Sequence, residues 1–254
     1  MSKPTLIFAA GAWYPSTIFD PIIKELADYT CHSVSFPSIQ QASSVVDLQP
    51  DIEAVRSITR QEADAGHDIV IIAHSWAGLP VSSALDGLSK SEREAADQKG
   101  GVVKLIFIAA FLPSIGEGLI GAFGGMPPPW YVRDEEKGTV TASDALVLFF
   151  HDVADGAEWV KLLKPHSWAT QNAPATSAAY MNIPSAYILT EEDRATPLPV
   201  QQVLVERARR KGAQIETEKI KTGHTPWLAM PDQVVAYIKK HAKESEEGTG
   251  SSLQ

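Results

Sequence analysis

Short runs of consecutive apolar residues recur along the chain, separated by stretches in which apolar residues recur every three or four positions. The apolar runs predict six strands, at residues 5–9, 33–36, 68–72, 104–110, 186–189 and 215–219. The stretches between and after them predict helices, at residues 19–26, 47–58, 75–88, 200–210 and 233–241. Strands that are apolar on both faces and alternate with helices indicate a three-layer α/β fold with about six mostly parallel strands.

Residues 111–183 break this alternation. They contain the run Gly-Gly-Met-Pro-Pro-Pro at 124–129 and many aromatic side chains, but no clear strand–helix unit. We therefore expect a mostly helical cap inserted over one α/β core, which residues 1–110 and 184–242 form together. The polar residues 243–254 predict a disordered tail.

Composition and charge narrow the possible functions. The chain has 254 residues, 44% of them hydrophobic and 21% charged, and a formal net charge of −9. An acidic chain without a Lys/Arg-rich run is not expected to bind nucleic acid. No apolar run reaches the roughly 18 residues of a membrane helix, so no membrane association is expected.

Cysteine and histidine usage argues against metal and cofactor sites. Cys31 is the only cysteine, which excludes an internal disulfide and any CxxC site. The seven histidines form no HxxxH pair, and no GxGxxG or P-loop motif occurs, so we expect no cofactor and no metal. The apolar residues 6–10 resemble a short signal sequence, but Trp13 follows closely without a cleavage site, and we interpret them as a strand. The default expectation is a cytoplasmic protein.

Ser75 is the first candidate for catalysis. It is the centre of the segment 73–77, Ala-His-Ser-Trp-Ala, which follows a predicted strand and opens a predicted helix. Small residues on both sides of a serine at such a sharp turn expose the hydroxyl, as in a nucleophile elbow. A helix-capping serine is the alternative. The segment around Ser177 has the same pattern but neither the strand nor the helix, and His74 would point elsewhere at such a turn.

The loop after the first strand is the second candidate. A serine attacking a carbonyl creates an oxyanion that two backbone N–H groups must stabilise. One N–H would come from Trp76, directly after the serine, and the other from Ala12 or Trp13 in the segment 10–13. Gly11 would let this loop approach closely, although a plain turn would also use a glycine.

A histidine and an acid follow two later strands. His224 lies on the glycine-containing loop 222–227, and the loop 190–197 offers Glu191, Glu192 and Asp193. A surface histidine and a solvated acidic turn are the alternatives. The order serine, acid, histidine, with each residue after a strand, is the chain order of the α/β-hydrolase triad. The carboxyl ends of strands are also where open α/β sheets bind ligands.

On these segments the chain resembles the α/β-hydrolase superfamily, and within it the small-esterase branch with plant methylesterases, hydroxynitrile lyases and uncharacterised fungal and bacterial hydrolases. The resemblance implies Ser75 as nucleophile, His224 as base and Asp193 as orienting acid, with Ala12 and Trp76 as oxyanion donors. Two departures from the family pattern stand out. Ala10 precedes the first-loop glycine where the family usually has histidine, and alanines flank the serine where glycine is common.

These features favour hydrolysis of a small, uncharged, partly apolar carboxylic ester or lactone through an acyl-Ser75 intermediate. The alternatives are a lyase or cyclase that uses the His224–Asp193 pair for proton transfer, and a protein that binds a small ligand without catalysis. The expected partner is a small-molecule substrate. We expect part of the pocket wall to come from aromatic residues, at Trp13, Phe111, Trp130, Phe149 and Trp227.

Overall fold

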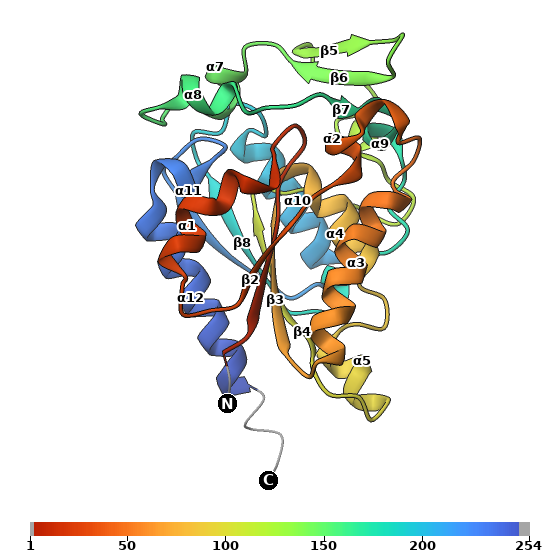
Figure 1. Cartoon of the computed structure of the whole chain (residues 1–254), viewed down its shortest axis with the longest axis vertical. Helices are drawn as coiled ribbons and strands as arrows, with labels where there is room; N and C mark the ends of the chain where they lie inside the picture. Colours follow the sequence, from red (N-terminus) through yellow and green to blue (C-terminus); the bar gives the residue numbers. More distant parts are fainter. Residues whose placement is uncertain (1–2, 249–254) are drawn as a thin grey trace.

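The computed structural model describes residues 3–248, and its centre is one six-stranded sheet (Figure 1). The strand order is β2-β1-β3-β4-β8-β9, and all neighbours are parallel. The strands are β1 (Thr5–Ala9), β2 (Cys31–Val34), β3 (Asp68–His74), β4 (Gly101–Ile108), β8 (Ser185–Thr190) and β9 (Ile215–Ile220). The predicted α/β class and the six parallel strands are confirmed.

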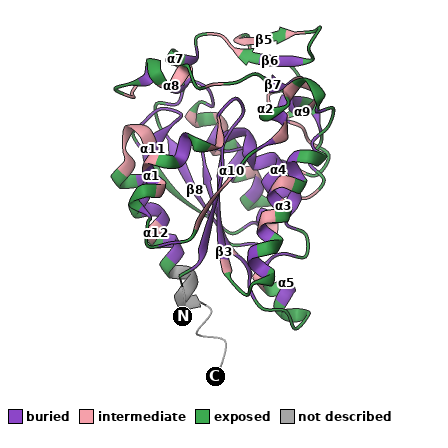
Figure 2. Ribbon diagram, in the orientation of Figure 1, coloured by how far each residue is buried: buried purple, intermediate pink, exposed green. Residues whose placement is uncertain are grey.

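The apolar runs became strands because both of their faces are covered. All residues of β1 and β8 are buried, and β3 and β4 are nearly so (Figure 2). Strand β9 differs, since only its first and last residues are buried. It lies at the edge of the sheet, which explains its polar interior.

Helices cover the two faces of the sheet (Figure 1). Helices α1, α11 and α12 contact one another on one face, and α3 packs against α4 on the other. The core helices are η1 (Ser16–Phe19), α1 (Asp20–Glu25), α2 (Pro37–Gln40), η2 (Ala42–Ser44), α3 (Gln49–Asp64), η3 (Ser75–Ala77), α4 (Gly78–Ala84), α5 (Lys90–Ala95), α10 (Leu198–Arg210), α11 (Pro226–Ala229) and α12 (Pro231–Gly248).

Several boundaries differ from the sequence prediction. The predicted helix 75–88 ends at Ala84, and α5 follows as a separate helix with a Ser89–Glu92 capping box. Asp47 lies one residue before the N-cap of α3, and its Oδ1 accepts the Gln49 N–H at 2.9 Å. Helix α12 continues to Gly248, so residues 243–248 are helical and not disordered as predicted. Residues 249–254 lie outside the described residues.

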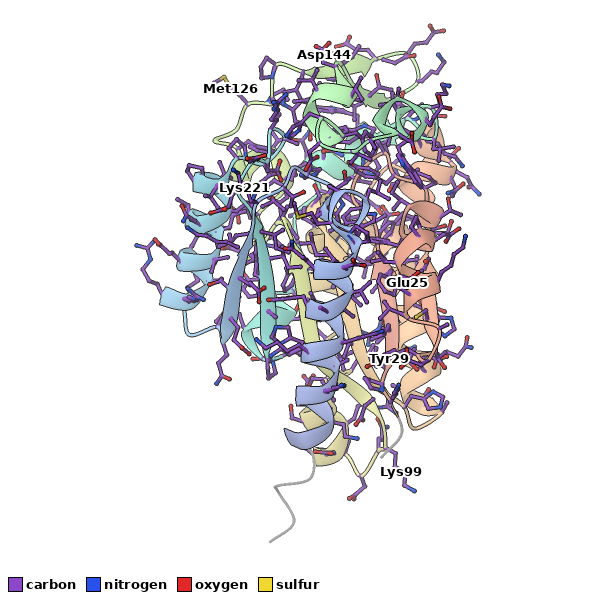
Figure 3. The ribbon with its side chains drawn as sticks, turned by 90° about the vertical axis from the view of Figure 1, so that its left-hand side faces the viewer. Glu25, Tyr29, Lys99, Met126, Asp144 and Lys221 are labelled. Carbon is purple, nitrogen blue, oxygen red and sulfur yellow. The ribbon has the colours of Figure 1, made fainter. Side chains whose placement is uncertain are left out.

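The segment 111–183, hereafter the cap, lies over one end of the main sheet (Figure 1). It is not mostly helical, because it contains an antiparallel sheet in the order β5-β6-β7. Its exposed outer parts include Met126 and Asp144 (Figure 3). The cap elements are α6 (Leu119–Ala122), β5 (Tyr131–Asp134), β6 (Thr139–Ala142), α7 (Ala145–Phe149), α8 (Gly156–Val160), β7 (His166–Ser167), α9 (Trp168–Asn172) and η4 (Ala179–Met181).

The part of the chain from residue 3 to 248 has no helix both long and apolar enough to cross a membrane. Within the same residues, no group of three or more His, Cys, Asp or Glu side chains is arranged to hold a metal ion.

Candidate active site

Ser75 occupies a sharp turn between β3 and η3. Its φ of +52° lies in the left-handed region, which non-glycine residues seldom adopt. The turn is tight because α4 begins against Phe111, in the segment that follows β4. A Cβ on Gly78 would lie 2.0 Å from the carbonyl oxygen of Phe111, and the Phe111 N–H donates to the Ser75 carbonyl at 3.1 Å. Gly78 is thus the position that admits no side chain, whereas the alanines at 73 and 77 are accommodated.

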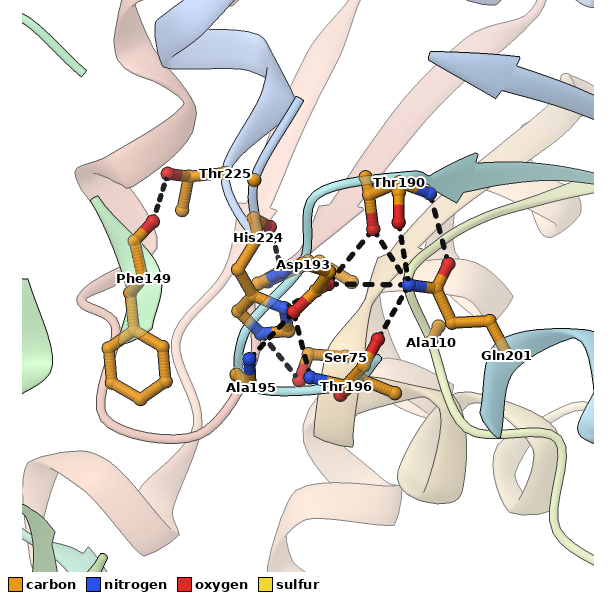
Figure 4. Close-up of polar contacts among 12 residues, drawn as sticks. Ser75, Ala110, Phe149, Thr190, Asp193, Ala195, Thr196, Gln201, His224 and Thr225 are labelled. Atoms are coloured by element: carbon orange, nitrogen blue, oxygen red, sulfur yellow. Dashed lines mark hydrogen bonds and ion pairs between the residues drawn. The ribbon is translucent and has the colours of Figure 1, made fainter. Parts of the chain in front are cut away.

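Ser75, His224 and Asp193 form one hydrogen-bonded chain, although they are far apart in the sequence (Figure 4). The Ser75 Oγ lies 3.1 Å from Nε2 of His224, and Nδ1 of the same ring lies 2.7 Å from Oδ2 of Asp193. All three residues are buried. With the ring proton on Nδ1 donated to the carboxylate, Nε2 is left to accept the serine proton.

The carboxylate of Asp193 is held by further donors. Its Oδ1 accepts the N–H groups of Ala195 and Thr196 at 2.8 and 2.7 Å. Its Oδ2 also accepts the hydroxyl of Thr190 at 2.9 Å and the amide of Gln201 at 3.4 Å. The carboxylate is therefore oriented by groups on β8, α10 and the loop between them.

The neighbouring acids point elsewhere. Glu192 lies 3.8 Å from the Lys221 ammonium, and Glu191 lies 4.0 Å from that of Lys219. Both glutamates are exposed. Among the three acids that the sequence left open, only Asp193 reaches His224.

His74 lies beneath the site and does not bond the Ser75 hydroxyl. Its Nε2–H donates to the carbonyl oxygen of His224 at 3.0 Å. Burial, with a smaller effect from the nearby His224, holds the pKa of His74 well below its usual value, so this imidazole is neutral. Its role is to support the backbone of the His224 loop.

The loop after β1 approaches Ser75 closely at Gly11. A Cβ on Gly11 would lie 2.9 Å from both Nδ1 of His74 and Cβ of Ser75. The next residue, Ala12, lines the same pocket as Ser75 and Trp76. Trp76 is the second residue of η3, so its N–H has no acceptor within that helix.

Trp13 follows in a strained conformation, with a φ of +71°. Two bonds to the cap hold it there. Its indole N–H donates to the Val140 carbonyl at 2.9 Å, and its own carbonyl accepts the Lys164 N–H at 2.9 Å. The cap therefore fixes the loop that contains Ala12.

A pocket of about 270 Å³ of empty space, part of it open to solvent, lies over Ser75. Apolar and aromatic side chains dominate its lining, and no Asp, Glu, Lys or Arg is among the described residues that line it. The lining comprises Ala12, Trp13, Ser75, Trp76, Phe111, Leu119, Phe123, Trp130, Tyr131, Phe149, Ala195, Thr196 and His224. Four of the five wall residues predicted from sequence are present: Trp13, Phe111, Trp130 and Phe149.

Trp227 was predicted as a wall residue and is not one. It is fully buried in the core, where its indole N–H donates to the Ile18 carbonyl at 3.0 Å. Its ring packs against Phe19 with 4.5 Å between ring centroids. It is the second residue of α11, which packs against α1 and α12.

The family model described as "Alpha/beta hydrolase family" matches residues 6–237. The chain belongs to this family. It is 31% identical over 254 residues to the alpha/beta hydrolase nvfD of Aspergillus novofumigatus, and the match covers 97% of this chain and 100% of that protein.

Solved structures of low identity share the fold of this α/β-hydrolase. A pyrethroid hydrolase from Sphingobium faniae JZ-2 is similar with a TM-score of 0.70 and 18% identity, covering 96% of this chain and 99% of its own. A methylesterase from Arabidopsis is similar with a TM-score of 0.67 and 19% identity, and the match covers 94% of this chain and 99% of the methylesterase.

Sequence reasoning missed several residues of this hydrolase's site. Leu119, Phe123 and Tyr131 reach the pocket from cap elements that carry no recognisable motif. Gln201 was part of a predicted helix, but nothing in its spacing indicated that its amide would bond to the Thr190 hydroxyl, at 2.8 Å, as well as to Asp193.

Proposed function

We propose that the protein is a serine hydrolase that cleaves a small, uncharged, partly apolar carboxylic ester or lactone. The observation that carries the proposal is the hydrogen-bonded chain from Ser75 through His224 to Asp193 at the base of an uncharged pocket. A serine whose hydroxyl contacts a histidine oriented by an acid is the arrangement of an activated nucleophile.

In the first half of the proposed reaction, Oγ of Ser75 attacks the ester carbonyl while Nε2 of His224 accepts the hydroxyl proton. Negative charge moves to the carbonyl oxygen, where the N–H groups of Ala12 and Trp76 would stabilise it. Asp193 stabilises the imidazolium and keeps the ring oriented. When the intermediate collapses, His224 returns the proton to the leaving alkoxide, and an acyl-Ser75 ester remains.

The second half repeats these steps with water. His224 takes a proton from water, the resulting hydroxide attacks the acyl carbonyl, and a second oxyanion forms in the same place. Collapse of this intermediate breaks the bond to Oγ, and the proton returns from His224 to Ser75. The net reaction consumes one water and releases one carboxylic acid and one alcohol, or a hydroxy acid from a lactone.

The pocket lining supports the substrate class. A charged substrate would lose its hydration here without an opposite charge, and burial of an unpaired charge is costly. The enclosed space is narrow, because the 270 Å³ of empty space includes open solvent and the room inside is about 10 Å³, close to that of one water. Aromatic walls around such a space suit a compact acyl or alcohol group with apolar surface.

A panel of short-chain esters, methyl esters and lactones tests the proposal. We expect the purified protein to hydrolyse at least one of them, and Ser75→Ala or His224→Ala to lower turnover by several orders of magnitude. Ser177→Ala is the matched control, because Ser177 has the same small-residue pattern but donates to Asp86 at 2.5 Å. Wild-type turnover in Ser75→Ala would refute the proposal.

A further inference from the structure

One segment of the cap contacts the loop that carries His224. The hydroxyl of Thr225 donates to the carbonyl oxygen of Phe149 at 2.7 Å (Figure 4). Three residues after Phe149, Asp152 makes two further bonds to the same loop. Its Oδ2 accepts the Thr222 hydroxyl at 2.7 Å and the Gly223 N–H at 2.6 Å. Residues 149–152 of the cap therefore bond to the chain on both sides of His224.

Gly223 shows how closely the two segments approach. A Cβ at this position would lie 2.7 Å from Oδ1 of Asp152 and 2.6 Å from Cε1 of His151. A Cβ would fit only if the His151 and Asp152 side chains shifted, so the close contact with the cap favours glycine here. Oδ1 of Asp152 is buried at this contact and has no hydrogen-bond partner among the described residues.

The core holds the same loop from below. His74 donates to the His224 carbonyl, and the Glu192 N–H donates to the Thr222 carbonyl at 3.0 Å. Asp193 bonds the imidazole itself. The loop on both sides of His224 is held by these two core groups and by two cap groups, the Asp152 carboxylate and the Phe149 carbonyl. The two cap groups belong to the segment that also forms the pocket wall, through Phe149.

We propose that Asp152 is a positioning residue for His224, so that the base is aligned with Ser75 only when the cap is seated on the loop. The inference rests on the proposed hydrolase function. Without the carboxylate, Thr222 and Gly223 lose their acceptor. The Thr225–Phe149 bond is then left to join this loop to the cap. A base displaced by about 1 Å can lower turnover about 100-fold.

The geometry defines a conservative variant. Both bonds end on a single oxygen, Oδ2, so one carbonyl oxygen can accept both. Asp152→Asn supplies that oxygen, whereas Asp152→Ala supplies none. Thr222→Val removes one bond and leaves the other. Asp155 is exposed on the same cap segment, makes no bond to the loop, and gives the control Asp155→Ala.

The experiment compares these four variants with the wild type. It measures kcat and KM on an ester that the protein hydrolyses, the rate of Ser75 labelling by a fluorophosphonate, and the Nδ1–H proton resonance of His224. His224→Ala identifies the resonance by its loss. Thermal unfolding shows whether each variant is folded.

For Asp152→Ala we expect kcat and the labelling rate to fall about 10- to 100-fold. We expect KM to stay within about twofold and the His224 resonance to shift or broaden, because the ring moves while the pocket walls do not. Thr222→Val should show a smaller loss, and Asp152→Asn and Asp155→Ala should resemble the wild type.

The proposal is wrong if folded Asp152→Ala keeps the wild-type kcat and His224 resonance. It is also wrong if the kcat of Asp155→Ala falls as much as that of Asp152→Ala. If Asp152→Ala does not fold, wild-type turnover and an unchanged resonance in Thr222→Val overturn the proposal. If the wild type neither hydrolyses an ester nor labels at Ser75, the proposed function fails. The resonance still shows whether Asp152 positions His224.

Discussion

The carboxylate of Asp193 lies 2.7 Å from Nδ1 of His224, on the opposite side of the ring from the serine hydroxyl. The two residues are 31 positions apart in the chain, and the ends of β8 and β9 bring them together. This contact makes Asp193 the acid that would hold the tautomer of His224 in the proposed reaction.

Asp193→Asn should therefore lower kcat by about 10³- to 10⁴-fold, because the amide does not enforce the tautomer that leaves Nε2 free. Glu192→Gln should change kcat less than about twofold, since Glu192 is paired with Lys221 at the surface. Steady-state kinetics on one ester substrate compare the two variants. A larger loss of kcat in Glu192→Gln than in Asp193→Asn would make Glu192 the acid that orients His224.

Trp130 should influence substrate choice. It lines the pocket and is only half-buried, so Trp130→Ala should change the ratio of kcat/KM between a bulky and a short ester more than it changes the melting temperature. Phe149→Ala should change the same ratio. Phe149 is fully buried, so its loss should also cost about 3–5 kcal/mol of unfolding free energy.

Competition assays with pairs of esters, followed by thermal unfolding, separate these effects. Unchanged ratios for both variants would mean that the pocket walls do not select the substrate.

The protein should release no appreciable cyanide from mandelonitrile. The hydroxynitrile lyases that this chain resembles carry a lysine directly after the catalytic histidine and a threonine in the first loop, and here Thr225 and Gly11 stand there. Thr225 donates its hydroxyl to Phe149, and no Lys or Arg is among the described residues that line the pocket. A cyanide anion leaving this pocket would meet a penalty of several kcal/mol.

A cyanide-specific assay run beside an ester assay on the same preparation checks this prediction. Cyanide release without ester turnover would favour the lyase alternative.

Asp51 should make stability depend on pH. Its side chain is fully buried, its Oδ1 accepts the Ser38 N–H at 3.0 Å, and its Oδ2 has no partner among the described residues. Burial raises the pKa of Asp51 from 3.8 to about 6, with the charge of Asp47 adding to it and the bonds to Ser38 opposing it. Between these two values the folded state holds a proton that the unfolded state releases.

The contribution of this group to stability therefore falls as pH rises through about 4 to 6, and the ionised carboxylate costs up to about 3 kcal/mol above that window. Asp51→Asn should raise the free energy of unfolding by about 2–3 kcal/mol at pH 8 and by only about 1 kcal/mol at pH 4.5. Urea unfolding of both proteins at the two pH values measures the difference. An equal change in the free energy of unfolding at pH 4.5 and pH 8 would contradict the titration assigned to Asp51.

The four central strands, β1, β3, β4 and β8, could be predicted from sequence because they are buried on both faces and therefore consist of continuous apolar runs. The cap sheet could not. Strand β5 has no buried residue and β6 has two, so no apolar run or strict alternation indicates them. Helix α5 depends on a capping box at Ser89 rather than on apolar spacing, and it was missed for that reason.

At the site, local motifs indicated Ser75 and His224, because each follows a strand in a short segment with a recognisable pattern. The same local reasoning gave the wrong prediction that Trp227 lines the pocket, because closeness to His224 in the chain does not fix the direction of its side chain. Asp152 could not be predicted, because its contact with Gly223 spans 71 residues and depends on how the cap folds back over the core.

In the proposed reaction, Ser75 forms a covalent acyl intermediate. Mass spectrometry of the protein, quenched in acid during turnover of a hydrolysed ester, tests it most directly, with His224→Ala and Ser75→Ala as comparisons. We expect a mass increase equal to the acyl group on the peptide that contains Ser75 in the wild type, and none in Ser75→Ala. Turnover with no adduct on that peptide, or with the adduct on another residue, would contradict the account.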